Sequence, residues 1–279
     1  MIREVGHDGL TLTVRDEGPS GGDVVILLHG FPQDSSCWDE VTPGLHRAGL
    51  RTLAPDQRGY SPAARPGDVA AYRLETLATD VLALLDSAGA ERAHVVGHDW
   101  GGALAWYLGA HHPERVTSLT VLSTPHPRAM LRSMVGSLQP VRSWYTLGVQ
   151  VPVVPELVLS RTLATTLRLS GLPADTARRY AARLSTPADL RGPLAWYRAV
   201  AWRPPWELLS GLTGPGAVPV PTSYLWGNRD PALGRAAAEG TAAHVTGAYL
   251  FIEVDAGHWL PETRPDEVVE TVLDRVGHA

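Results

Sequence analysis

The chain of 279 residues contains a single cysteine, Cys37, and no lysine. One cysteine cannot form an intrachain disulfide, which favours a reducing compartment, and we therefore expect a cytoplasmic protein. We interpret Cys37 as a packing residue near the start of a helix rather than as a catalytic thiol. All 24 basic residues are arginines, which together with the many alanines indicates a GC-rich genome rather than a function.

Long hydrophobic runs are also missing. Residues 1–8 are polar and lack the apolar stretch of a signal peptide. The longest apolar run of the middle, residues 149–159, is interrupted by Pro152 and Pro155 and is too short to span a bilayer. A net charge of −5 gives no reason to expect binding to nucleic acid or to an acidic membrane, so neither is a predicted partner.

Hydrophobic residues make up 44% of the chain and charged residues 19%, which predicts a globular protein with a sizeable core. Residues 24–28 are continuously apolar, as in a central strand, whereas residues 10–14 alternate, as in an edge strand. Strands alternate with helices, which implies an α/β fold with a mostly parallel sheet and helices on both faces. The other predicted strands are residues 51–54, 93–96, 119–122, 219–226 and 249–254, and the predicted helices are residues 38–50, 74–85, 103–108, 233–245 and 265–276.

The pattern changes between residues 127 and 217. This segment is helical, rich in aromatic residues and punctuated by prolines, and it has no clear alternating strand. We therefore predict one α/β core, made of residues 1–126 and 218–279, and a helical cap, residues 127–217, inserted between core strands.

The stretch Gly97-His98-Asp99-Trp100-Gly101 lies between an apolar strand and a helical pattern. This is the context of a nucleophile elbow, Gly-x-Ser-x-Gly, with an aspartate where a serine is usual. A carboxylate that attacked a carboxylic ester would form a costly mixed anhydride. It can, however, displace a leaving group from a tetrahedral carbon and form an alkyl ester. Asp99 therefore indicates hydrolysis of carbon–oxygen or carbon–halogen bonds, not the chemistry of an esterase or lipase.

An aspartyl nucleophile needs a base for water, an acid that orients the base, and donors for the oxyanion. The expected chain order is nucleophile, acid, histidine. His258 follows the last predicted strand and can activate water, because the pKa of a histidine lies near operating pH. Asp230 follows the preceding strand and can hold the imidazole tautomer. The predicted oxyanion donors are the backbone N–H groups of Phe31 and Trp100.

Other conspicuous polar residues receive a structural interpretation. His98 adjoins the nucleophile but should face away from the base, and His29 should brace the oxyanion loop. His111 and His112 lack a third ligand nearby in the sequence, so we predict no metal site. The loop of residues 56–60 follows a strand and is interpreted as structural support.

These motifs resemble the α/β-hydrolase superfamily, and specifically its branch of epoxide hydrolases and haloalkane dehalogenases. The resemblance covers almost the whole core and implies an α/β-hydrolase fold that needs no cofactor. Both kinds of enzyme share the aspartate, acid and histidine, so these three residues do not choose between them. The matching motifs are His29-Gly30-Phe31-Pro32, Asp56-Gln57-Arg58-Gly59-Tyr60-Ser61, Gly97-His98-Asp99-Trp100-Gly101-Gly102, Asp230 and Gly257-His258-Trp259.

The leaving group distinguishes the two chemistries. An opening epoxide develops a basic alkoxide, to which a tyrosine can supply a hydrogen bond and then a proton. Epoxide hydrolases carry two such tyrosines on the cap, and Tyr145 and Tyr197 lie in segments similar to both. The segment around Tyr145 departs from the family at Gly148 and Val149, where an aromatic residue is frequent. Tyr180 lies between the two without a motif, and we interpret it as structural.

We predict an epoxide hydrolase that forms an ester on Asp99 and uses Tyr145 and Tyr197 to activate the epoxide oxygen. Its predicted partners are a small apolar epoxide and water, and a homo-oligomer stays open. One alternative is a haloalkane dehalogenase with the same triad. A halide needs only N–H donors, which Trp100 and a cap tryptophan such as Trp144, Trp202 or Trp206 could supply. The alternative of another class is an inactive α/β-hydrolase that serves as a ligand-binding module.

Overall fold

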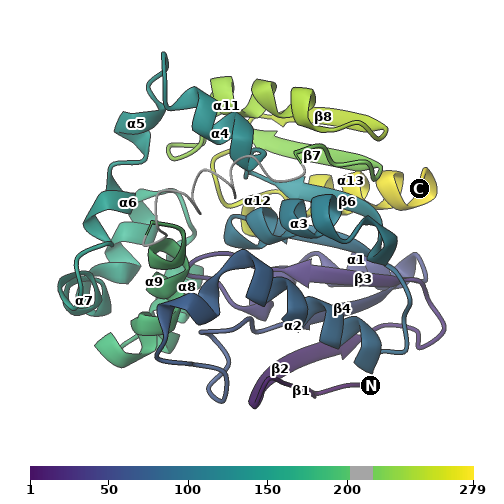
Figure 1. The fold of residues 1–279 in the computed structure, drawn as a ribbon, viewed down its shortest axis with the longest axis horizontal. Helices are drawn as coiled ribbons and strands as arrows, with labels where there is room; N and C mark the ends of the chain where they lie inside the picture. Colours follow the sequence, from purple (N-terminus) through teal and green to yellow (C-terminus); the bar gives the residue numbers. More distant parts are fainter. Residues whose placement is uncertain (202–215) are drawn as a thin grey trace.

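The computed structural model describes residues 1–201 and 216–279, and an eight-stranded sheet lies at the centre of this part of the chain (Figure 1). The strand order is β1-β2-β4-β3-β5-β6-β7-β8. The pairs β1–β2 and β2–β4 are antiparallel, and the remaining neighbours are parallel. The strands are β1 (Glu4–His7), β2 (Leu10–Glu17), β3 (Val24–Leu28), β4 (Arg51–Pro55), β5 (Ala93–His98), β6 (Val116–Leu122), β7 (Thr222–Gly227) and β8 (Tyr249–Val254).

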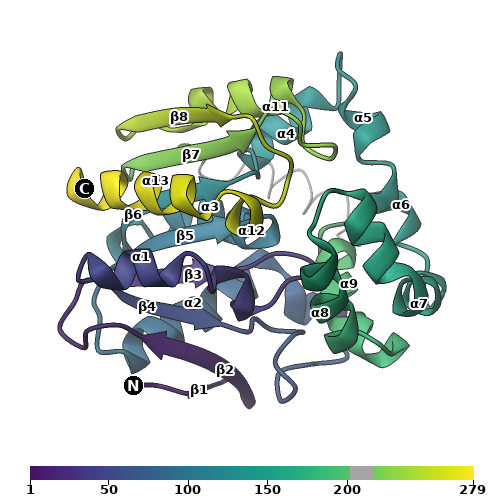
Figure 2. The same cartoon turned by 180° about the vertical axis from the view of Figure 1, so that it is seen from behind.

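Helices cover both faces of the sheet, as the alternation predicts. One face carries α2 (Leu74–Ser87), α3 (Trp100–His111) and α11 (Arg235–Gly240), seen in front in Figure 1. The other carries α1 (Thr42–Arg47), the short α12 (Leu260–Thr263) and α13 (Pro265–Gly277), in front in Figure 2. Short 3₁₀ turns complete the core: η1 (Ser35–Trp38), η2 (Val69–Tyr72), η3 (Pro113–Arg115) and η4 (Thr241–His244).

Two of the differences from the sequence prediction concern residues 10–14 and 38–50. Residues 10–14 are not an edge strand, because β2 lies between β1 and β4 and the edge is β1. The helical spacing over residues 38–50 corresponds to η1 and the short α1, whose first turn contains Pro43.

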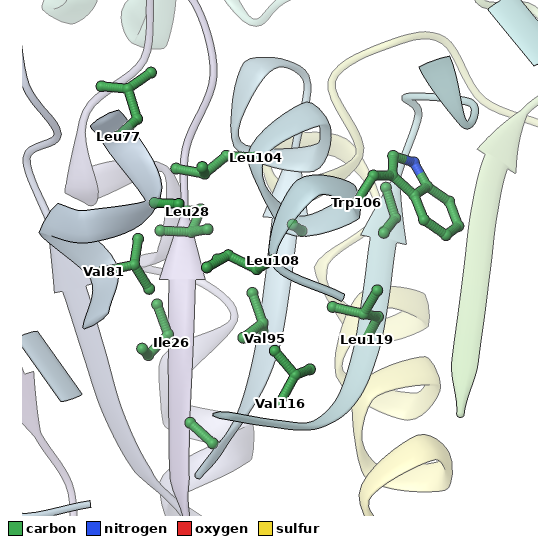
Figure 3. Packing of buried hydrophobic residues seen from close by; sticks show 14 of the residues in the cluster. Ile26, Leu28, Leu77, Val81, Val95, Leu104, Trp106, Leu108, Val116 and Leu119 are labelled. Atoms are coloured by element: carbon green, nitrogen blue, oxygen red, sulfur yellow. The ribbon is translucent and has the colours of Figure 1, made fainter. Parts of the chain in front are cut away.

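The central strands are buried on both faces, and this explains their continuous apolar sequences. Every residue of β5 is buried, and so are the last four of β3. Figure 3 shows the packing of one face, where strand side chains meet those of α2 and α3. The labelled members are Ile26, Leu28, Val95, Val116 and Leu119 from strands, and Leu77, Val81, Leu104, Trp106 and Leu108 from helices.

The described part of the predicted insertion is helical. Its helices are α4 (Pro127–Ser133), α5 (Gln139–Arg142), α6 (Tyr145–Gly148), α7 (Val154–Leu169), α8 (Ala174–Arg183) and α9 (Pro187–Ala201). Helices α5–α9 lie beyond one end of the sheet, whereas α4 packs against α11 (Figures 1 and 2). The insertion is tied to the core by polar contacts. The Arg183 guanidinium pairs with Asp34 at 3.0 Å and with Asp56 at 2.7 Å, and the Trp196 indole donates to the backbone oxygen of Arg58 at 2.9 Å.

None of the helices in the two described ranges combines the length and apolar composition needed to cross a lipid bilayer.

Candidate active site

The backbone at Asp99 turns sharply from β5 into α3. Asp99 has φ 52° and ψ −120°, a conformation that a residue with a side chain adopts only when its surroundings enforce it. The neighbouring glycines make room for this turn. A Cβ on Gly97 would lie 2.3 Å from the backbone oxygen of Gly101, and a Cβ on Gly101 would lie 2.1 Å from that of Leu28. The elbow predicted from the sequence is therefore present, with Asp99 at its apex.

Asp99, His258 and Asp230 lie in line. The Nε2 atom of His258 is 3.5 Å from Asp99 Oδ2, and its Nδ1 donates to Asp230 Oδ2 at 2.7 Å. The other oxygen of Asp230 accepts hydrogen bonds from the backbone N–H groups of Ala232 and Leu233, at 2.8 and 3.0 Å. Asp230 is thus fixed by its own loop and presents one oxygen to the imidazole.

The charges of this group support one another. Burial lowers the pKa of His258, but the charge and hydrogen bond of Asp230 and those of Asp99 outweigh this and raise it to about 10. Burial raises the pKa of Asp99, yet His258 and the Phe31 N–H bring it below 3.8. At neutral pH the site therefore holds an aspartate anion beside an imidazolium.

One of the two predicted oxyanion donors points at the nucleophile. The backbone N–H of Phe31 donates to Asp99 Oδ1 at 2.8 Å. Trp100 is the first residue of α3, where helix geometry leaves a backbone N–H without an intrahelical partner. Its service as the second donor stays a prediction.

Buried polar side chains hold the loops that carry these groups. His29 contacts the Gly30 carbonyl through Nδ1 at 3.0 Å, and its Nε2 accepts from the backbone N–H of Gln57 at 3.2 Å. His98 bridges Gln33 Oε1 and the backbone oxygen of His258, at 2.8 and 2.9 Å, and burial lowers its pKa to about 4. Both histidines thus occupy bracing positions. The expectation that His98 faces away from the base is wrong, because its ring centroid lies 4.9 Å from that of His258 and its Nε2 contacts the His258 carbonyl.

Two bracing residues were not found from the sequence. Gln33 accepts from the backbone N–H of Gly30 at 2.9 Å and donates to Glu262 at 2.7 Å. Ser123 follows β6 and donates to the His258 carbonyl at 2.8 Å. Gln33 lies directly after a quoted motif, but nothing in the local pattern indicates which backbone groups it contacts.

The two predicted cap tyrosines lie close to each other and near Asp99. Tyr145 begins α6 and Tyr197 lies near the end of α9, and their ring centroids are 6.4 Å apart. The ring of Tyr197 also meets Trp100 edge-on, with centroids 4.9 Å apart, and Phe31 at 5.6 Å. Burial, together with the charge of Asp99, raises the pKa of both hydroxyls. Both therefore keep their protons at neutral pH.

The remaining candidates lie apart from this site or outside the described residues. Cys37 is buried, and burial raises the pKa of its thiol, which suits a packing residue. Trp144 is 70% exposed, so its indole does not line a buried site. Trp202 and Trp206 lie outside the described residues. Within residues 1–201 and 216–279, no three His, Cys, Asp or Glu side chains are grouped so as to hold a metal ion.

An elbow, a following acid and a final histidine on a mostly parallel sheet define a hydrolase fold. The chain matches the family described as "alpha/beta hydrolase fold" over residues 23–265 and belongs to it. It is 34% identical to the AB hydrolase superfamily protein YfhM of Bacillus subtilis (strain 168), over 97% of this chain and 96% of that protein.

Other relatives are epoxide hydrolases by name. Epoxide hydrolase A of Mycobacterium tuberculosis (strain ATCC 25618 / H37Rv) is 35% identical over 98% of this chain and 96% of that protein. The crystal structure of Epoxide Hydrolase A from Mycobacterium thermoresistibile superposes with a TM-score of 0.84 at 30% identity, over 99% and 97% of the two chains. These matches confirm the predicted fold class and the resemblance to epoxide hydrolases.

Proposed function

We propose that this protein hydrolyses epoxides to vicinal diols in two steps, through an ester on Asp99. The observation that carries the proposal is that two protonated tyrosines lie close to each other and near an aspartate that is paired with a histidine. Full-length similarity to proteins named epoxide hydrolases supports the same chemistry. Residues 127–217 would act as the cap that covers the epoxide and supplies both hydroxyls.

In the first step an Asp99 oxygen attacks the less hindered or more activated ring carbon. The new carbon–oxygen bond forms as the ring bond breaks, and the electron pair of that bond stays on the ring oxygen. Tyr145 and Tyr197 hydrogen-bond to this oxygen, and one of them gives it a proton. The raised pKa of each hydroxyl suits this role, since it keeps the proton available until an alkoxide develops.

Esterification removes the negative charge of Asp99, the residue that faces Nε2 of His258. The ester carries no charge, so the imidazolium loses one of the two anions that raise its pKa to about 10. It then returns a proton to the tyrosinate and becomes a neutral base. The charge pair of the resting site thus prepares the base for the second step.

In the second step His258 takes a proton from water, and the hydroxide adds to the Asp99 ester carbonyl. The Phe31 N–H already points at this carboxyl and would bind the oxyanion, together with Trp100. The ester bond breaks, and the diol leaves with the proton from His258. The acid formed on Asp99 then returns its own proton to His258, which restores the starting charges.

Dehalogenation is the weaker candidate. A departing halide needs an N–H donor in addition to Trp100. Exposed Trp144 does not offer a buried one, Trp202 and Trp206 lie outside the described residues, and the named relatives are epoxide hydrolases. Phe31 has no side-chain hydrogen bond to give. An inactive ligand-binding module is also disfavoured, because the nucleophile, base and acid are all in contact.

The test is incubation of the purified protein with styrene oxide and, separately, with 1-bromobutane. Diol release supports the proposal, bromide release supports the dehalogenase, and the absence of both products leaves the binding module or an untested substrate. Asp99→Asn should abolish turnover, whereas His258→Gln should trap an adduct of protein plus epoxide that intact mass spectrometry detects. Normal turnover by His258→Gln would exclude the two-step mechanism.

The two tyrosines are tested by replacement with phenylalanine, which keeps the ring and removes the proton. Loss of general acid catalysis typically lowers a rate by about 10²- to 10⁴-fold. The double variant with Tyr145→Phe and Tyr197→Phe should therefore form the ester far more slowly. Hydrolysis of an ester already formed should change little. An unchanged rate of ester formation in this double variant would remove both tyrosines from the mechanism.

A further inference from the structure

A buried ion pair lies directly beside Tyr197. The next residue, Arg198, pairs with Glu156 through both ends of its guanidinium, at 2.6 and 3.1 Å. The two side chains are 7% and 4% exposed. Burial raises the pKa of Glu156, but the hydrogen bond from Arg198 brings it below its usual value, so the acid stays ionised. The pair lies wholly within the helical insertion, between α9 and the first turn of α7.

The same guanidinium holds the segment that carries Tyr145. Arg198 Nε donates to the backbone oxygen of Val149 at 3.0 Å, and Nη2 donates to that of Val151 at 3.1 Å. Val149 ends the single turn of α6 that Tyr145 begins, and its N–H donates to the Tyr145 carbonyl at 3.1 Å. One turn of helix has little stability of its own. The place of Tyr145 therefore depends on contacts such as these.

Strain in the connecting loop points to the same constraint. Val153 has φ 71° and ψ −43°, and the N–H of Val154 donates to the Pro152 carbonyl at 2.8 Å across it. This is a γ-turn with a positive φ at a β-branched residue, a conformation that costs energy and needs surrounding support. Arg198 supplies that support, because it binds the chain on both sides of Val153, at Val151 and at Glu156.

We propose that Arg198 is a positioning residue that sets the spacing of Tyr145 and Tyr197, with Glu156 as its buried counter-charge. The arginine side chain ties the segment of one tyrosine to the helix of the other, and Glu156 orients its guanidinium. Both hydroxyls can then reach one epoxide oxygen at once. The inference rests on the proposed function, since it assigns these residues to the ester-forming step alone.

A positioning role and a purely stabilising role predict different behaviour in variants. A buried pair can often be replaced by apolar residues without loss of stability, whereas removal of one partner leaves a buried charge and destabilises. The double variant E156L/R198M should therefore fold well but lack the donors to Val149 and Val151. E156Q should be destabilised, yet its arginine keeps both donors to the backbone.

The experiment monitors a single turnover of styrene oxide by stopped-flow tryptophan fluorescence. The same trace gives the rate of ester formation and then the rate of ester hydrolysis. Misplacement of a reacting group by about 1 Å can cost about 10²-fold. We expect E156L/R198M to form the ester about 10- to 100-fold more slowly, with hydrolysis within about threefold of the parent. E156Q should form the ester within about threefold of the parent, although it melts at a lower temperature. R198K should recover little of the lost rate, because an ammonium cannot reproduce the planar fork.

R51M is the matched control, since Arg51 forms a similar two-bonded pair with Asp16 at 2.8 and 2.7 Å in the core sheet. It should lower the melting temperature and leave ester formation unchanged. The inference is overturned if the rate of ester formation simply follows the melting temperature across all four variants, or if E156L/R198M forms the ester normally. If the parent protein forms no diol, or if the Y145F/Y197F double variant forms the ester normally, the proposed function fails first.

Discussion

Replacement of Asp230 by asparagine tests how the base is oriented. One oxygen of Asp230 accepts two backbone hydrogen bonds, from Ala232 and Leu233, and the other faces His258. An asparagine can keep its oxygen toward the two backbone N–H groups, but its NH₂ then faces Nδ1 of the imidazole. Nδ1 of the neutral imidazole must then accept a hydrogen bond from this NH₂ group. The imidazole proton therefore lies on Nε2, which has no lone pair left to accept a proton from water.

The size of the effect follows from these contacts. The opposite amide orientation leaves two buried backbone donors unsatisfied, at about 1 to 3 kcal/mol each, or about 2 to 6 kcal/mol in all. The amide orientation that presents oxygen to His258, and so keeps the productive tautomer, is therefore rare. Ester hydrolysis should fall by about 30-fold to about 10⁴-fold. Ester formation should fall by less than about tenfold, since Nε2–H still faces Asp99. Asp230→Asn should thus accumulate the ester.

Quench-flow with intact mass spectrometry measures both steps, and Asp230→Ala is the control. The alanine variant leaves the loop donors without a partner and should be less stable, but it does not impose the wrong tautomer. We expect it to hydrolyse the ester faster than Asp230→Asn. Equal losses in the two chemical steps, or faster hydrolysis by the asparagine variant, would refute the orienting role of Asp230.

Two further predictions concern pH and stability. Since the pKa of Asp99 lies below its usual value and the pKa values of both tyrosine hydroxyls lie above theirs, ester formation should be constant from about pH 5 to about pH 9. Single-turnover rates check this, and a loss of rate between pH 7 and pH 5 would contradict it. Asp80→Asn should lower the free energy of unfolding by about 3 to 5 kcal/mol in denaturant titrations, because it leaves the buried Arg58 guanidinium without its counter-charge. A loss under about 1 kcal/mol would show that Arg58 finds compensation elsewhere.

The parts of the fold that could be predicted from the sequence are those with strong local patterns. The apolar runs at residues 24–28 and 249–254 coincide with β3 and β8. β1 was missed because it has four residues, of which only Val5 is buried. The polar end of β2 was missed because Asp16 is buried through its pair with Arg51, and a pairing across 35 positions leaves no local signal.

The same distinction applies to the site. Asp99 and His258 stand in short motifs with glycines that the turns require, so sequence alone indicated them. Asp230 followed from chain order, since no acid follows the strand that ends at Leu122. The link between Arg198 and Glu156 spans 42 positions and involves backbone oxygens of a loop, which no periodicity reveals. The cytoplasmic location and the absence of a cofactor stay predictions.

The crowding beneath the nucleophile limits how this enzyme could be altered by protein engineering. A Cβ on Gly30 would lie 2.3 Å from the Cβ of Asp99, so even alanine there would push the nucleophile from its place. Gly97 and Gly101 are closed to substitution for the same reason. Libraries aimed at new substrates would therefore lose most of their members if they varied the elbow. Variation belongs instead in the insertion, at positions other than Tyr145, Glu156, Arg183, Tyr197 and Arg198.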